Sequence, residues 1–135
     1  MALNLKDAVA VKAARLNAIS TYAGTSAKLR IYTGSQPANS DAAIGAVTLL
    51  AEHICNATAF AATTSTGVLT ANAIANATAV GTGTAAWFRV WRSDGTTPVF
   101  DGTAGTATSD LILDNTSINT GQVVSISSLT RTAGN

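Results

Sequence analysis

Charged residues are scarce in this chain. They make up 11% of the 135 residues, with eight Lys and Arg against seven Asp and Glu, which gives a net charge of +1. The ordinary share of charged residues is about 25%. Because phosphate binding needs clustered Lys and Arg, the sequence predicts no nucleic-acid partner. A surface with so little charge tends to associate, so we expect a partner to cover part of it.

Cysteine, histidine and long apolar runs are also scarce. Cys55 is the only cysteine, which excludes a disulfide within the chain. The longest apolar runs fall far short of the roughly 20 residues of a membrane-spanning helix, so no membrane partner is predicted. Lys6, Asp7 and Lys12 interrupt the N-terminal segment before it could form the apolar region of a secretion signal. We therefore expect a protein that is made and kept in a cytoplasm, or assembled there into a larger structure.

Small residues dominate what is present. The chain has 27 Ala and 21 Thr, and 47% of its residues are hydrophobic, which argues against disorder. Its length favours one domain, residues 1–135. The first segment has apolar residues at helical spacing, and Asn4 and Gly24 have the residue types of a helix N-cap and C-cap. These features predict a helix over 5–22, whose thin apolar stripe must dock on a sheet or a neighbouring subunit.

Alternation with a period of two begins after Gly24. Residues 27–32 and 84–91 alternate most clearly, and an Asp-Gly turn at 93–96 predicts a hairpin between 84–91 and 98–102. Shorter strands are expected at 48–55, at 111–113 and at 122–132, and either two short strands or one extended edge at 68–79. Strands at such spacing over 27–132 predict a mainly β domain with one N-terminal helix, which could be a β-sandwich, a jelly roll or a barrel.

The residue types of catalytic and metal sites form no convincing cluster. His53 and Cys55 share one strand face, but their Cα atoms would lie almost 7 Å apart, which does not favour a nucleophile pair. His53 and Cys55 would supply only two ligands, and a zinc site normally has four. Asp101 and Asp110 could be a carboxylate pair for glycoside hydrolysis, but nothing distinguishes them from other acids. We expect no enzyme activity, no metal and no cofactor.

Three large side chains share one face of the strand at 84–91. Trp87, Arg89 and Trp91 alternate with Phe88 and Val90. An exposed aromatic and arginine ladder would suit a protein interface, stacked sugars or single-stranded nucleic acid, and a protein interface leads because Trp and Arg are typical anchors. A strand covered on both faces, with the helix on one of them, is an equally weighted alternative. The candidate interface residues are Leu5, Val9, Leu16, Tyr32, Trp87, Arg89 and Trp91.

Several segments, in this order, are similar to small virion structural proteins of tailed bacteriophages. They are LRIYTGSQPA (29–38), GVLT (67–70), GTAAWFRV (83–90), SDL (109–111), GQVVSI (121–126) and TAGN (132–135). The resemblance covers nearly the whole chain and brings no catalytic residues with it. These segments resemble those of capsid decoration or cement proteins in particular.

The resemblance implies a β-sandwich or jelly-roll domain present in many copies on the outer surface of the phage head. The partner would be the major capsid protein, whose subunit contacts the decoration protein stabilises, and the protein would be made in the host cytoplasm. We expect a homo-oligomer, either a trimer or a dimer. The alternative is a tail, neck or fibre-associated virion protein that binds host-surface glycans through Trp87, Trp91 and Tyr32.

Overall fold

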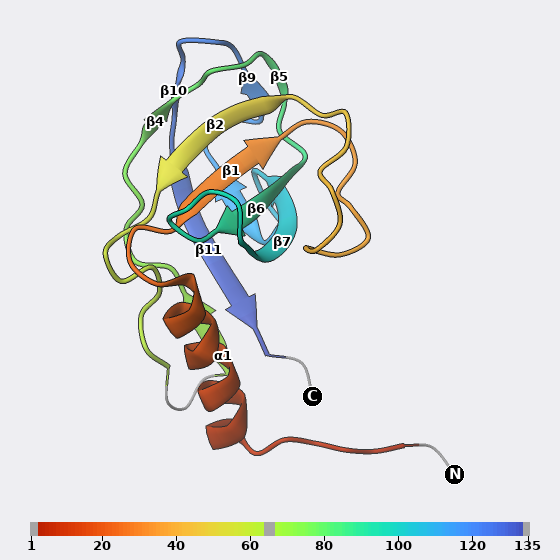
Figure 1. The fold of residues 1–135 in the computed structure, drawn as a ribbon, viewed down its shortest axis with the longest axis vertical. Helices are drawn as coiled ribbons and strands as arrows, with labels where there is room; N and C mark the ends of the chain where they lie inside the picture. Colours follow the sequence, from red (N-terminus) through yellow and green to blue (C-terminus); the bar gives the residue numbers. More distant parts are fainter. Residues whose placement is uncertain (1–2, 64–66, 134–135) are drawn as a thin grey trace.

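A computed structural model describes residues 3–63 and 67–133 of the chain as one helix and eleven short strands (Figure 1). The mainly β class with one N-terminal helix is confirmed. Within these residues no helix has both the length and the apolar character to span a membrane. The elements are α1 (Val9–Ala23), β1 (Lys28–Tyr32), β2 (Leu49–Ile54), β3 (Val68–Thr70), β4 (Ala77–Thr78), β5 (Gly83–Thr84), β6 (Trp87–Trp91), β7 (Pro98–Gly105), β8 (Leu111–Leu113), β9 (Ser117–Ile118), β10 (Val123–Val124) and β11 (Ile126–Thr132).

Helix α1 begins four residues later than predicted. Ala8 precedes it in an extended conformation with ψ of 153° and provides no side-chain cap, so Asn4 is not the N-cap. The predicted C-cap is confirmed, because Gly24 has φ of 72° and its N–H bonds to the carbonyl of Ser20, and the helix ends at Ala23, one residue beyond the predicted end. Residues 3–8 therefore form an extended arm that leaves the body of the molecule at the base of α1 (Figure 1).

Seven of the strands form one sheet in the order β2-β1-β6-β7-β8-β11-β3. All neighbours pair antiparallel except β7 and β8, which are parallel and share only the pairs Ala104–Leu111 and Gly105–Ile112. The predicted hairpin is present as β6 and β7. Two small sheets, β10-β4 and β5-β9, stand at the end of the molecule opposite α1 (Figure 1).

The long predicted strands are interrupted in the structure. Residues 84–91 divide into β5 and β6, residues 122–132 into β10 and β11, and residues 68–79 contain the short strands β3 and β4. The interruptions let the chain leave the main sheet for the two small sheets. The strands expected near 27–32, 48–55 and 111–113 are found at β1, β2 and β8.

Both halves of the main sheet contribute to one apolar core. Leu29 and Ile31 of β1 and Phe88 and Val90 of β6 are fully buried, as their alternation predicts. The other half of the sheet adds Leu69, Leu111, Leu113 and Leu129. Helix α1 closes the core by packing against β3 and β7, with Leu16 buried at 2% exposure.

Candidate functional site

The strand face that carries Trp87, Arg89 and Trp91 is covered in the structure. Trp87 is 1% exposed and Arg89 is 2% exposed, while Trp91 is half-buried. The prediction of an exposed ladder is therefore wrong for Trp87 and Arg89, and the alternative of a strand covered on both faces describes them. The cover of this face is not the helix, as that alternative supposed, but the loop of residues 33–48.

Arg89 holds this loop against the sheet. Its Nη1 donates to the carbonyl of Ala42 at 2.9 Å, and its Nη2 donates to the carbonyl of Asn39 at 3.3 Å. On the neighbouring strand β7, Asp101 lies opposite Arg89 and accepts from Nε at 2.5 Å and from Nη2 at 2.8 Å. All three guanidinium nitrogens thus have acceptors, which is the condition for keeping this charge out of water.

Aromatic rings fill the rest of the covered face. Tyr32 of β1 stacks on Trp87 with ring centroids 4.6 Å apart, and the Trp87 indole N–H donates to the carbonyl of Thr33 at 3.0 Å. The guanidinium of Arg89 lies between the rings of Trp87 and Trp91, at 5.6 and 5.2 Å. Because Tyr32 and Trp87 are buried, the role in stacking glycans predicted for them is wrong.

The outer part of the same face carries a second group of charged side chains, which is more accessible to solvent. Arg30 bonds to Glu52 through Nε at 2.6 Å, donates to the carbonyl of Gly95 at 3.0 Å, and lies 5.5 Å from the Trp91 ring. Lys28 stands 4.0 Å from the same carboxylate. The Trp91 indole nitrogen is buried and finds no hydrogen-bond acceptor among the described residues.

The other predicted interface residues lie apart from this face. Leu5 is 89% exposed on the arm, Val9 is about half exposed at the start of α1, and Leu16 is buried in the core. The structure therefore brings Tyr32, Trp87, Arg89 and Trp91 together, but it does not bring the three helix-side residues to them. Of the seven, Leu5 and Val9 are the two that solvent reaches freely.

His53 and Cys55 are both buried, and each favours its neutral form. The Nδ1 of His53 lies 3.0 Å from the carbonyl of Ala75, and burial lowers the pKa of the ring. Its Nε2 has no partner among the described residues. Burial raises the pKa of the Cys55 thiol to about 11. Within residues 3–63 and 67–133 no group of three or more His, Cys, Asp or Glu side chains could hold a metal ion.

The aspartates of the C-terminal third serve separate local structures. Asp94 closes the β6–β7 turn by accepting from the N–H groups of Thr96 and Thr97, both at 2.9 Å, and its hydrogen bonds, led by that from the Thr97 hydroxyl, lower its pKa. Asp101 is occupied by Arg89. Asp110 accepts from both the N–H and the hydroxyl of Thr103 at 2.9 Å. The two Asp-Gly pairs therefore belong to a turn and to a strand.

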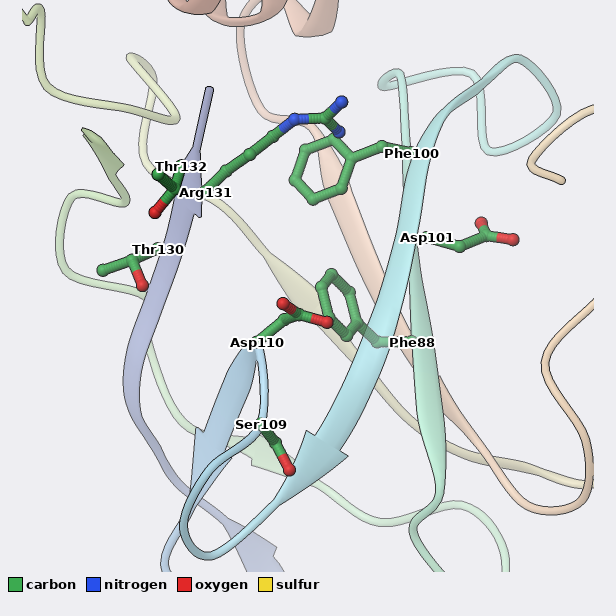
Figure 2. A pocket seen from close by; sticks show the side chains of 8 residues that line it. All are labelled: Phe88, Phe100, Asp101, Ser109, Asp110, Thr130, Arg131 and Thr132. Atoms are coloured by element: carbon green, nitrogen blue, oxygen red, sulfur yellow. The ribbon is translucent and has the colours of Figure 1, made fainter. Parts of the chain in front are cut away.

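A cavity of about 410 Å³ opens between β7 and β11, and the sequence did not predict it (Figure 2). The two strands diverge beyond the point where β8 begins. Figure 2 shows the Arg131 side chain reaching from β11 toward Phe100 on β7, and its guanidinium lies 4.9 Å from the centre of that ring. The lining residues are Phe88, Phe100, Asp101, Ser109, Asp110, Thr130, Arg131 and Thr132.

No signal in the sequence could have located this cavity, because it arises where strands distant in sequence part from each other. A smaller cavity of about 260 Å³ continues past Arg131 to the α1 residues Leu16 and Ile19.

Comparisons with protein-family models, with curated proteins and with solved structures give no match for the chain.

Proposed function

We propose that the protein is a structural component of a bacteriophage virion that decorates the outer surface of the head. In this role it binds the major capsid protein in many copies and stabilises the contacts between its subunits. The proposal rests on the ordered set of segments that resemble small virion proteins of tailed phages, of which GTAAWFRV (83–90) spans β5 and most of β6. The same resemblance suggests a homo-oligomer on the capsid surface.

The placement of exposed apolar side chains supports a bridging role. Val80 and Val123 are 62% and 56% exposed next to the small β4-β10 sheet. At the opposite end, Val9 and Val11 are about half exposed on α1 (Figure 1). A molecule with apolar contacts at both ends of its long axis can join two neighbours in a lattice. Repetition over that lattice then adds weak contacts into strong attachment.

The decisive experiment is to locate and count the protein in purified particles. We expect mass spectrometry to find hundreds of copies per particle and electron cryo-microscopy to place them on the head. Absence from particles contradicts the proposal. A location confined to the tail, neck or fibres also contradicts it, and supports the alternative of a host-binding virion protein.

Surface variants test which end contacts the capsid. Val80→Asp combined with Val123→Asp should lower the occupancy of undecorated heads at least tenfold, because two charges would be buried at the contact. Ser127→Asp is the matched control, since it places a charge on an exposed position of β11. Equal occupancy by the double variant and the control removes the β4-β10 end from the interface.

A further inference from the structure

The cavity between β7 and β11 is a vacant strand position in the main sheet. Strand β8 separates β7 from β11 in the sheet order, but it begins only at Leu111. Beyond that residue β7 and β11 both continue with no strand between them, and the Arg131 side chain reaches across the gap (Figure 2). Where β8 begins, the two strands are two strand spacings apart, roughly 9.6 Å, which is the width that one further strand occupies.

The backbone of β11 is oriented to pair with such a strand. The carbonyl of Leu129 accepts from Ala71 and the N–H of Ala133 donates to Gly67, both at 2.9 Å. These odd-numbered residues therefore face β3. Backbone groups alternate in direction along a strand, so the backbone N–H and C=O groups of Thr130 and Thr132 point toward the cavity. Thr130 makes only a long hydrogen bond there, 3.5 Å from its nitrogen to the carbonyl of Asp110.

The backbone of β7 is oriented in the same way. Ala104 donates to Ala86 at 3.1 Å, so the even-numbered residues of β7 face β6 and the odd-numbered Asp101 and Thr103 face the cavity. The N–H of Thr103 already donates to the Asp110 carboxylate. The side chain of Asp101 accepts from Arg89 on β6. The cavity thus has strand edges on both sides and the buried rings of Phe88 and Phe100 among its lining residues.

A segment with the matching properties leaves the body of the same molecule. Residues 3–8 form the extended arm before α1. Leu3 and Leu5, which are 97% and 89% exposed, alternate along it with Asn4 and Lys6. In a strand, the two leucines would share one face and the polar pair would share the other. Two leucines left in water on an extended backbone gain most from a site that offers both backbone partners and, where Arg131 moves aside, the face of the Phe100 ring.

We propose that the arm of one copy enters the cavity of a second copy and adds a strand between β7 and β11. Leu3 and Leu5 then take the place of the Arg131 side chain against the Phe100 ring, while the arm backbone pairs with the edge residues Asp101 and Thr132. Arg131 is exposed, so its side chain can swing off the Phe100 ring to admit the strand. This exchange between copies does not depend on a location in a virion.

The arm reaches a neighbour and not its own cavity because of how its base is held. Asp7 is ion-paired with Arg15 on the side of α1, at 2.5 Å. From that point the arm runs away from the sheet (Figure 1). The geometry therefore favours the arm of a second copy as the occupant of the cavity. The experiments below distinguish this from a chain whose arm fills its own cavity.

The test compares the oligomeric state of full-length variants by sedimentation velocity and native mass spectrometry. Thr132→Pro removes a backbone N–H that faces the cavity and leaves the bonds to β3 in place. Its matched control, Thr132→Val, keeps that N–H. On the arm, Leu5→Asp is compared with Asn4→Asp, which adds the same charge to the opposite face. We expect the wild type and both controls to oligomerise, and Thr132→Pro and Leu5→Asp to weaken association at least tenfold.

A mixing experiment identifies exchange between copies. A chain that lacks residues 2–7 has a cavity and no arm, whereas Thr132→Pro has an arm and a blocked cavity. Each should be monomeric alone, and an equimolar mixture should form a one-to-one heterodimer. Circular dichroism and thermal melts verify that each variant folds, and Thr130→Trp, which fills the cavity from an exposed position, replaces Thr132→Pro if that variant does not fold.

Three results would overturn the proposal. The first is a wild-type chain that stays monomeric at high concentration, which places the arm in its own cavity or on a different partner. The second is an armless chain that oligomerises as the wild type does. The third is equal association of Thr132→Pro and Thr132→Val, which shows that the cavity edge plays no part in assembly.

Discussion

Arg89 and Asp101 form a two-pronged ion pair across β6 and β7, with side chains only 2% and 3% exposed. The pair does more than neutralise two charges, because the same guanidinium donates to the carbonyls of Asn39 and Ala42 in the covering loop. One side chain thereby joins two strands of the sheet to a loop about fifty residues away in the sequence. The loop closes the face that would otherwise expose Trp87.

Asp101→Ala should destabilise the fold strongly. It leaves the Arg89 charge buried without its carboxylate, and breaking a buried pair in this way costs about 3 to 5 kcal/mol. The double variant Arg89→Met with Asp101→Leu should be more stable than Asp101→Ala, because it removes the isolated charge. Urea unfolding followed by tryptophan fluorescence measures both. Equal stability of the single variant and the wild type would show that the pair contributes nothing.

Arg89→Lys tests the attachment of the loop separately from the charge. A lysine keeps the positive charge but cannot reach two loop carbonyls and the carboxylate with fixed geometry. We expect faster amide hydrogen exchange in residues 39–47, while exchange in α1 stays unchanged. Uniformly faster exchange across the chain would indicate global destabilisation instead.

Trp87→Phe should cost about 1 kcal/mol, because it removes the hydrogen bond to the carbonyl of Thr33 and keeps an aromatic ring against Tyr32. Trp87→Ala should cost about 3 to 5 kcal/mol, since it also leaves a cavity. Chemical denaturation of the two variants provides the comparison. A phenylalanine variant as unstable as the alanine variant would place the whole contribution in the indole N–H.

Stability should fall at alkaline pH because of Cys55. Burial raises its thiol pKa from 9.0 to about 11, so the folded state keeps a proton that the unfolded chain loses. The contribution is complete below about pH 9 and is lost as the pH rises to about 11. The loss is on the order of 2 to 3 kcal/mol at about 1.4 kcal/mol per pKa unit. Cys55→Ala should flatten this part of the stability profile, measured by urea unfolding at pH 8 to 11.

Stability should also fall at acid pH because of His53. The carbonyl of Ala75 can only accept, so Nδ1 carries the proton and buried Nε2 is the atom that acid must charge. Burial lowers the pKa of the ring, so its contribution is present above the unfolded value of about 6.5 and is lost as the pH falls below it. His53→Phe should be less sensitive between pH 7.5 and 5. An identical profile in both proteins would assign the acid loss to the carboxylates.

The strands of the core could be predicted because their signal is local. Leu29 and Ile31 alternate with polar neighbours, and an Asp-Gly turn follows β6, so period and turn chemistry are both present in a short window. The start of α1 could not be predicted in this way. Asn4 has the residue type of an N-cap, but Ala8 starts the helix without any side-chain cap.

The covered face could not be derived from the sequence because its cover is distant. Alternation correctly placed Trp87 and Arg89 on the face opposite Phe88, but nothing near them in the sequence indicates that residues 33–48 fold over that face. The guanidinium group of Arg89 donates hydrogen bonds to acceptors that lie 12, 47 and 50 residues away in the sequence. The cavity between β7 and β11 has the same origin, since its walls come from strands joined only through β8.

The order of the strands has a consequence for how the chain folds. β11, which follows the other described strands in the chain, lies between β8 and β3 and supplies Leu129 to the core. A nascent chain can form the β6–β7 hairpin early, but it cannot close the sheet until β11 has been made. Pairings between such distant segments form slowly. Before β11 is in place, the apolar side chains of β3 and β8 lack their neighbour, so a chain that lacks β11 would aggregate in the cell and not fold to a smaller domain.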